Sequence, residues 1–93
     1  MDSLSEDERL KIRRSLLLLE NDGEIPSRYI KFIRDGIWEY RVSHLRKEFR
    51  LLYFYDGQTI IILLNCFLKK TQKTPLQEIE KAIKLKKEYY EQK

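Results

Sequence analysis

The sequence lacks the residues that several kinds of functional site require. Its single cysteine, Cys66, cannot form an internal disulfide, and together with the single histidine, His44, it supplies too few ligands for a metal site. Three glycines are too few for a nucleotide-binding glycine loop. The longest apolar runs, "LLLL" and "IIILLNCFL", are far shorter than the roughly 20 residues of a membrane helix. These absences predict a cytoplasmic protein with no metal, no cofactor and no membrane segment.

The residues that are present indicate one small globular domain, spanning residues 1–93. Hydrophobic residues make up 42% of the chain and charged residues 37%, which is typical of a folded protein with a well-solvated surface. The net charge is +4, and residues 37–75 alone carry seven basic and three acidic side chains. This distribution predicts a positive patch for a phosphate backbone or an acidic protein, the alternative being an ordinary basic surface.

Two helices are expected at the N-terminus. Ser5 and Glu8 form a capping-box pattern at the start of "SEDERLKIRRSLLLLENDG", which predicts a helix that ends near "NDG". The segment "IPSRYIKFIRDG" favours a second, shorter helix with Pro26 in its first turn and Gly36 as its stop. Together the two segments predict a helical hairpin.

Three antiparallel strands are expected next. In "IWEYRVS" apolar and charged residues alternate with period two, and "SHLRKE" is the turn into a second strand, "FRLLYFY". Asp56 and Gly57 are a hairpin signal, because type I′ turns need positive φ at both central residues. The following "QTIIILLNCF" is apolar almost throughout, as expected of a central or covered strand.

A final helix is expected after the third strand. Thr74, Pro75 and Gln77 form a second capping-box pattern at the start of "TPLQEIEKAIKLKKEYYEQK". The predicted fold class is therefore α+β, with an N-terminal helical hairpin packed on a small antiparallel sheet and a C-terminal helix.

Three stretches together resemble one protein family. They are "GIWEYR", "FRLLYFYDG" and "LLNCFLKKTQKTPLQEIEKA". Their order and spacing resemble the RelE/ParE superfamily of bacterial type II toxins, in particular its HigB-like branch, which includes phage proteins. The resemblance implies a small antiparallel sheet with two helices on one face. Family members usually begin with a further strand, so we expect that strand to be missing and the chain to be truncated or to pair edge to edge as a homodimer.

The resemblance also implies ribosome-dependent cleavage of messenger RNA, in which a ribose 2′-oxygen attacks the neighbouring phosphate. Arg41 and Arg50 are predicted to grip that phosphate, and Lys69 and Lys70 to hold RNA or assist proton transfer. Glu39 and Lys73 are predicted substrate contacts on the same patch. The alternative for Glu39, Arg41 and Arg50 is a salt-bridge ladder on a solvated sheet face.

Other side chains are weaker candidates. His44 could contact substrate or act as a general base, but in a polar turn it is more often a solvated surface residue. Tyr53 and Tyr55 could stack on bases, although packing against helices is the commoner role for residues that alternate with Arg50. Tyr89 and Tyr90 lie where some relatives have a functional aromatic residue, and helix packing is again the alternative.

The predicted function is a toxin that acts as a metal-independent endoribonuclease on the ribosome and is neutralised by a helix-turn-helix antitoxin. Relatives of the same fold inhibit DNA gyrase without cutting RNA, so a binding-only toxin remains an alternative. An inactive member of the family is a third possibility.

Overall fold

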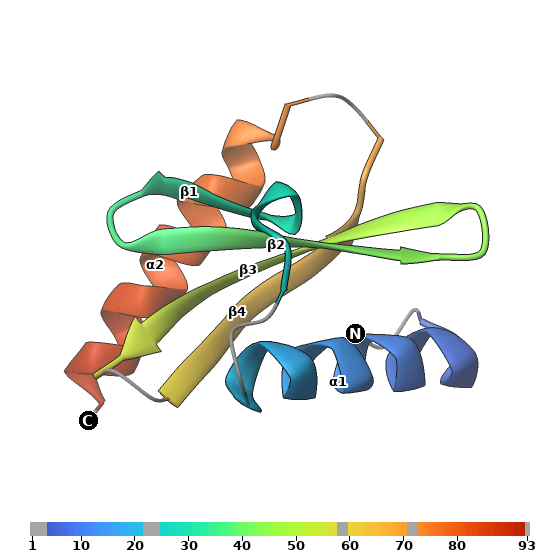
Figure 1. The fold of residues 1–93 in the computed structure, drawn as a ribbon. Coiled ribbons are helices and arrows are strands. Elements are labelled where there is room, and N and C mark those ends of the chain that lie inside the picture. Colours follow the sequence, from blue (N-terminus) through green and yellow to red (C-terminus); the bar gives the residue numbers. More distant parts are fainter. Residues whose placement is uncertain (1–3, 22–24, 58–59, 71–72, 93) are drawn as a thin grey trace.

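The computed structural model describes residues 4–21, 25–57, 60–70 and 73–92. Its elements follow one another along the chain as shown in Figure 1: α1 (Glu6–Asn21), the 3-10 turn η1 (Ser27–Tyr29), β1 (Ile30–Arg34), β2 (Ile37–His44), β3 (Lys47–Asp56), β4 (Ile60–Leu68) and α2 (Leu76–Glu91). The four strands form one sheet in the order β1-β2-β3-β4, with every neighbouring pair antiparallel. The predicted α+β class is confirmed.

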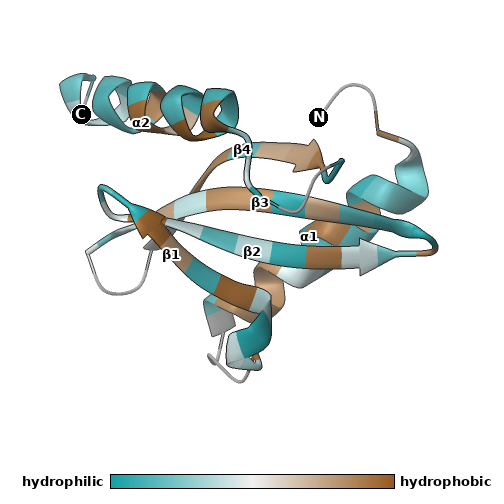
Figure 2. Cartoon of the chain, turned by 90° about the horizontal axis from the view of Figure 1, so that it is seen from above, coloured by the Kyte–Doolittle hydropathy of each residue, from teal (hydrophilic) through white to brown (hydrophobic). Residues whose placement is uncertain are grey.

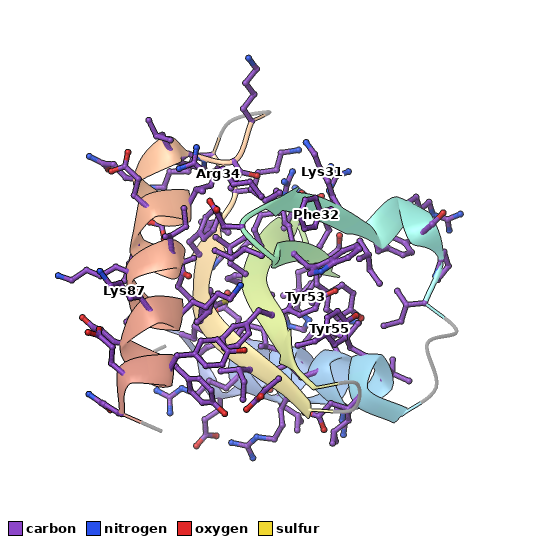
Figure 3. All side chains as sticks on the ribbon, turned by 90° about the vertical axis from the view of Figure 1, so that its left-hand side faces the viewer. Lys31, Phe32, Arg34, Tyr53, Tyr55 and Lys87 are labelled. Atoms are coloured by element: carbon purple, nitrogen blue, oxygen red, sulfur yellow. The ribbon has the colours of Figure 1, made fainter. Side chains whose placement is uncertain are left out.

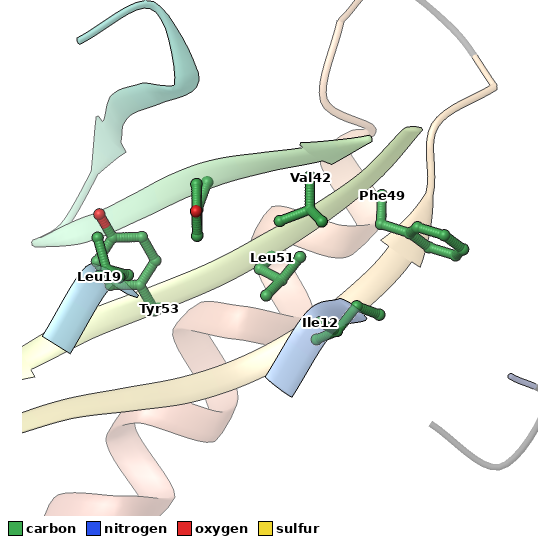
Figure 4. Packing of buried hydrophobic residues seen from close by; sticks show 7 residues of the cluster. Ile12, Leu19, Val42, Phe49, Leu51 and Tyr53 are labelled. Carbon is green, nitrogen blue, oxygen red and sulfur yellow. The ribbon is translucent and has the colours of Figure 1, made fainter. Parts of the chain in front are cut away.

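The two helices lie on opposite faces of this sheet (Figure 2). Ile12 of α1 packs into a buried cluster with Leu51, while Ala82 of α2 packs with Leu52. Neighbouring residues of a strand point to opposite faces, so Leu51 and Leu52 assign one face to each helix. Figure 4 shows the α1 cluster, which is completed by Leu19, Tyr40, Val42, Phe49 and Tyr53. The expectation of two helices on one face is therefore wrong.

The segment predicted as a second helix is mostly a strand. After η1, β1 pairs with β2 through partners such as Phe32 and Trp38. Asp35 and Gly36 have φ angles of +53° and +75°, so this Asp-Gly pair forms a hairpin turn and does not end a helix. The predicted helical hairpin is wrong because five residues are too few to separate a period of two from a period of 3.6.

The sheet thus has four strands where three were predicted. β3 is its central buried strand, with six consecutive buried residues, Phe49–Phe54. β4 lies at an edge, so of the two predicted alternatives the central strand is wrong and the covered strand is confirmed. Its apolar run still has a reason, because Leu63 packs on the α1 cluster and Leu64 on the α2 cluster. The absence of the family's usual first strand stays a prediction.

The β2–β3 hairpin sets the register on which the predicted site depends. His44 pairs with Lys47, which leaves a two-residue turn at Leu45 and Arg46 in the centre of "SHLRKE". Leu45 has a φ of +58°, as this tight turn requires. The same register pairs Arg41 directly with Arg50, so both side chains leave the sheet on the α2 face.

Two helix caps and the β3–β4 turn were also predicted, and only the α1 cap and the β3–β4 pairing are confirmed. At α1, the Ser5 amide donates to Glu8 Oε1 over 2.9 Å and the Glu8 amide donates to Ser5 Oγ over 3.2 Å, which confirms the capping box. At α2, the residue before the helix is Pro75 with no side-chain cap, and the Thr74 hydroxyl donates to Glu39 instead. Asp56 pairs with Ile60 within the sheet, so the predicted β3–β4 hairpin is confirmed but its Asp56–Gly57 turn is wrong.

Candidate functional site

The α2 face of the sheet carries a buried ionic network at its centre. Arg50 Nη1 donates to Glu39 Oε1 over 2.8 Å, and Arg50 Nε donates to Glu48 Oε2 over 2.7 Å. The Arg50 side chain is 3% exposed and that of Glu39 is 0% exposed. Two carboxylates therefore compensate the Arg50 charge away from solvent, as buried ions require. In this structure Arg50 lies beneath the surface, and its predicted contact with a phosphate stays a prediction.

Arg41 occupies the accessible position beside this network. Its side chain is 37% exposed, and its Nε lies 3.6 Å from Glu39 Oε1. That Nε is buried and makes no hydrogen bond to any described residue. Buried donors are nearly always satisfied in folded proteins, so the Arg41 guanidinium is incompletely paired. Because its side chain is also partly exposed, it is suited to binding an anion from solution.

The connection from β4 to α2 lies across the same network. The Lys69 amide donates to the Glu48 carbonyl oxygen over 2.8 Å, and Lys69 Nζ lies 3.6 Å from Glu48 Oε2. Farther along, the Thr74 hydroxyl donates to Glu39 Oε2. Lys70 and Lys73 are exposed on this connection. The structure therefore brings the connection that carries the predicted lysines onto the face that holds Arg41.

Charge also affects the acids of this face. Burial alone would raise the pKa of Glu48, but its hydrogen bond to Arg50 and the nearby cations Lys69 and Arg41 lower that pKa below its ordinary value. Glu48 is therefore held as a carboxylate, and it is better suited to orienting cations than to taking up a proton.

One residue of this face was missed by the sequence analysis. Lys31 lies on β1 directly opposite Glu39, and it lines a surface pocket with a volume of about 280 Å³ together with Lys73 and Thr74. Figure 3 shows Lys31 and Phe32 on this strand. Because residues 25–36 were predicted as a helix, nothing placed Lys31 beside Glu39. The signal that was available is the Asp35–Gly36 pair, the same hairpin signal that was recognised at Asp56–Gly57.

The other candidates lie elsewhere. His44 is at the far end of β2, and strand alternation puts it on the opposite face from Arg41. The structure therefore does not bring His44 into the cationic cluster.

The predicted tyrosines also lie away from the cationic cluster. Tyr53 and Tyr55 are on the α1 side of β3 (Figure 3), with ring centroids 5.6 Å apart, and Tyr53 is fully buried. Burial raises the pKa of the Tyr53 phenol. Tyr89 donates to the Asp56 carboxylate, and both Tyr89 and Tyr90 pack on Phe54. These contacts are those of packing residues.

Neither a metal site nor a reactive thiol is found among the residues that the structure describes. Within residues 4–21, 25–57, 60–70 and 73–92, no three histidine, cysteine or acidic side chains are grouped to hold an ion. Burial raises the pKa of the Cys66 thiol to about 11, so this thiol is protonated near neutral pH. No helix in these ranges is long and apolar enough to cross a membrane. Metal-independent chemistry stays a prediction.

Fold and site together define a small α+β protein with a cationic sheet face between an edge strand and the C-terminal helix. Comparison with known proteins assigns the family: the phage-derived Gp49-like family (DUF891) matches residues 1–87, and the chain belongs to it. Two curated relatives, each named "Probable endoribonuclease HigB1", come from the CDC 1551 and H37Rv strains of Mycobacterium tuberculosis. Each is 39% identical over 61 residues, which cover 66% of this chain and 48% of the relative. The resemblance to HigB-type toxins is confirmed, and the chain spans about half the length of the curated relatives it matches.

Proposed function

We propose that this protein is the toxin of a type II toxin-antitoxin system and cleaves messenger RNA on the ribosome. The observation that carries the proposal is the convergence of cations from separate segments on one face of the sheet. Arg41 comes from β2, and Lys69 and Lys73 come from the β4–α2 connection, which also carries the exposed Lys70. Family membership and the printed name of the HigB1 relatives support the same activity.

The chemistry needs positive charge and little else from the protein. As the 2′-oxygen attacks, negative charge grows on the phosphoryl oxygens and on the departing 5′-oxygen. The exposed part of the Arg41 guanidinium is suited to hold two phosphoryl oxygens. Lys69 and Lys70 are suited to hold the RNA backbone or to supply a proton to the leaving oxygen, and Lys73 to bind the RNA farther along.

Arg50 and Glu39 take a different part in this proposal. Their burial and short contacts support a positioning role, in which Glu39 holds Arg50 on one oxygen and Thr74 on the other. Glu39 also lies 3.6 Å from Arg41 Nε and so restricts the orientation of that side chain. Direct contact of Arg50 or Glu39 with RNA would require the network to open.

The test is cell-free translation with purified protein, followed by mapping of messenger ends. Arg41→Ala is expected to abolish most ribosome-dependent cleavage without loss of folding. Arg34→Ala is the matched control, because Arg34 is an exposed arginine that pairs with its neighbour Asp35 at 3.3 Å. Full cleavage by the Arg41 variant would refute the proposed role of the cationic face.

A binding-only toxin is the second candidate, and one observation favours it. The carboxylates of Glu39 and Glu48 lie at the centre of the cationic cluster, and they neutralise the charge of Arg50. A toxin that only binds an acidic partner such as gyrase does not have to hold a scissile phosphate, so it can function with the charge of Arg50 neutralised. Inhibited supercoiling by gyrase with intact messenger would support this candidate, and an inactive family member would affect neither assay.

The partners follow from the proposed class. We expect a helix-turn-helix antitoxin, the ribosome and messenger RNA as partners, all in the cytoplasm. The outer edge of β4 has no neighbouring strand among the described residues, and Leu68 at its end is 38% exposed. A homodimer paired through β4 is therefore predicted, and a monomer in size-exclusion chromatography would refute it.

A further inference from the structure

A pocket between β1 and the start of α2 adjoins the cationic face and has its own chemistry. It has a volume of about 280 Å³ and is lined by Lys31, Phe32, Ile33, Lys73, Thr74 and Ile79. These residues come from β1 and, about 40 positions later in the chain, from the segment that leads into α2 and from the first turn of α2. This volume is slightly below the usual range of about 300–1,000 Å³ for ligand pockets, which suits a single nucleotide unit better than a larger ligand.

The charged part of the pocket is positive. Two lysines, Lys31 and Lys73, line it together with Thr74, and none of the described residues that line it is acidic. Glu39 lies across the strands from Lys31, but its two carboxylate oxygens are bonded to Arg50 and Thr74. Among the described residues, Lys31 has no acidic partner within the 4.0 Å of an ion pair. Its charge is therefore available to an anion from solution.

Phe32, the neighbour of Lys31 on β1, carries an exposed ring. Phe32 is 51% exposed, which is unusual for a large apolar side chain on a strand. Trp38 holds it in place from β2, edge to face, with the ring centroids 5.2 Å apart. Trp38 packs on the α1 cluster, so the Phe32 ring lies on the α1 face of the sheet, on the opposite side from Lys31 and Arg41.

The pocket is also in line with Arg41. Lys31 is opposite Glu39, and Arg41 is two residues farther along β2 on the same face. Strand geometry puts the Cα atoms of Lys31 and Arg41 about 8 Å apart, so both side chains can reach phosphates of one continuous strand.

We propose that this pocket binds one nucleotide of the RNA strand, beside the nucleotide whose phosphate contacts Arg41. The Lys31 ammonium binds the phosphate of that nucleotide. The proposal rests on the proposed RNA-directed function and adds a binding residue, Lys31, on the strand that sequence analysis assigned to a helix.

The test is binding of a ten-nucleotide single-stranded RNA, made uncleavable by 2′-O-methyl groups, measured by fluorescence anisotropy at several salt concentrations. Lys31→Gln is expected to weaken binding and to lower the slope of log K against log [salt] by about 0.7, the contribution of one phosphate contact to a single strand. Phe32→Leu is expected to leave binding unchanged, because the Phe32 ring lies on the opposite face of the sheet from Lys31.

Lys87→Gln is the matched control, because Lys87 is an exposed lysine on α2 (Figure 3) that does not line the pocket. It should bind RNA as the unaltered protein does. Equal losses in the Lys31 and Lys87 variants would show a general charge effect and overturn the pocket, and so would unaltered binding by Lys31→Gln or no RNA binding by the unaltered protein.

Cleavage on the ribosome is measured separately with the same proteins. If the unaltered protein binds RNA through Lys31 but cuts no messenger, the nuclease proposal fails and the pocket stands. If it cuts messenger and the Lys31 variant binds RNA normally, the pocket fails and the nuclease stands.

Discussion

Replacing Arg50 by methionine tests whether the centre of the cationic face is a structural ion network. Methionine keeps most of the side-chain volume but leaves Glu39, which is 0% exposed, without its main cation. Removing one partner of a buried pair costs about 3–5 kcal/mol, because the remaining charge stays buried. The Thr74 hydroxyl and Arg41, at 3.6 Å, still contact Glu39, so we expect the lower end, about 3 kcal/mol.

That loss is large for a chain of 93 residues. Domains of this size have roughly 5–14 kcal/mol of unfolding free energy, and each kcal/mol shifts Tm by about 4–8 °C. The Arg50→Met variant should therefore melt at least about 12 °C lower by circular dichroism, with a matching shift of the urea midpoint. Arg41→Met is the control, because its 37% exposed side chain should cost less than about 1 kcal/mol.

A double variant separates the ion pair from simple packing. Glu39→Leu combined with Arg50→Met replaces both charges by apolar side chains, so no unpaired Glu39 carboxylate remains in the core. Its destabilisation should be smaller than the sum of the two single effects by at least about 1 kcal/mol. If Arg50→Met lost no more stability than Arg41→Met, the network would not be a buried one and the positioning role of Arg50 would be refuted.

Three further predictions concern turns, pH and caps. Gly36→Ala and Gly57→Ala should each cost about 1–2 kcal/mol in chemical denaturation, because their φ angles are +75° and +77°. The two losses should be similar, because the atom nearest to a Cβ at Gly36 is the end of the flexible Lys86 side chain, which can move away. Because folding lowers the Glu48 pKa, the stability from this carboxylate is present above its ordinary value of 4.5 and is lost as pH falls through the lower folded pKa; Glu48→Gln should flatten that acid decline in melting curves. Ser5→Ala removes one half of the α1 capping box and should cost about 1 kcal/mol in urea unfolding, whereas Ser5→Thr should retain most of that stability.

Sequence patterns predicted correctly the features that depend on residues close together in the chain. The capping box at Ser5 is confirmed, because both of its hydrogen bonds join residues three positions apart. The pairing of Arg41 with Arg50 is also confirmed, because a two-residue turn sets the register of the whole hairpin. Lys31 was missed because its strand is short and gains its stability from pairing with β2.

Burial of the predicted arginine had no local signal. Arg50 alternates with apolar residues in β3 as an exposed residue would, and two distant segments cover it. Glu39 reaches it from β2, and the β4–α2 connection closes over the pair through Lys69 and Thr74. A capping-box pattern at Thr74 was equally plausible from sequence, but a hydroxyl that can reach a buried carboxylate stabilises more than one that caps a helix exposed to water.

These contacts give Glu39 a part in both the fold and the site. One of its oxygens accepts from Arg50 and lies near Arg41, while the other accepts from Thr74, so a single buried carboxylate touches β3, β2 and the segment before α2. The lysines that the proposed function requires are on that segment, and the exposed arginine is on the strand that carries Glu39 itself. Because a buried carboxylate has few alternative partners, its geometry is more tightly restricted than that of the surface cations around it. Under the proposed function, the network therefore need not touch RNA to affect cleavage, because it restricts the positions of the cations that are proposed to contact RNA.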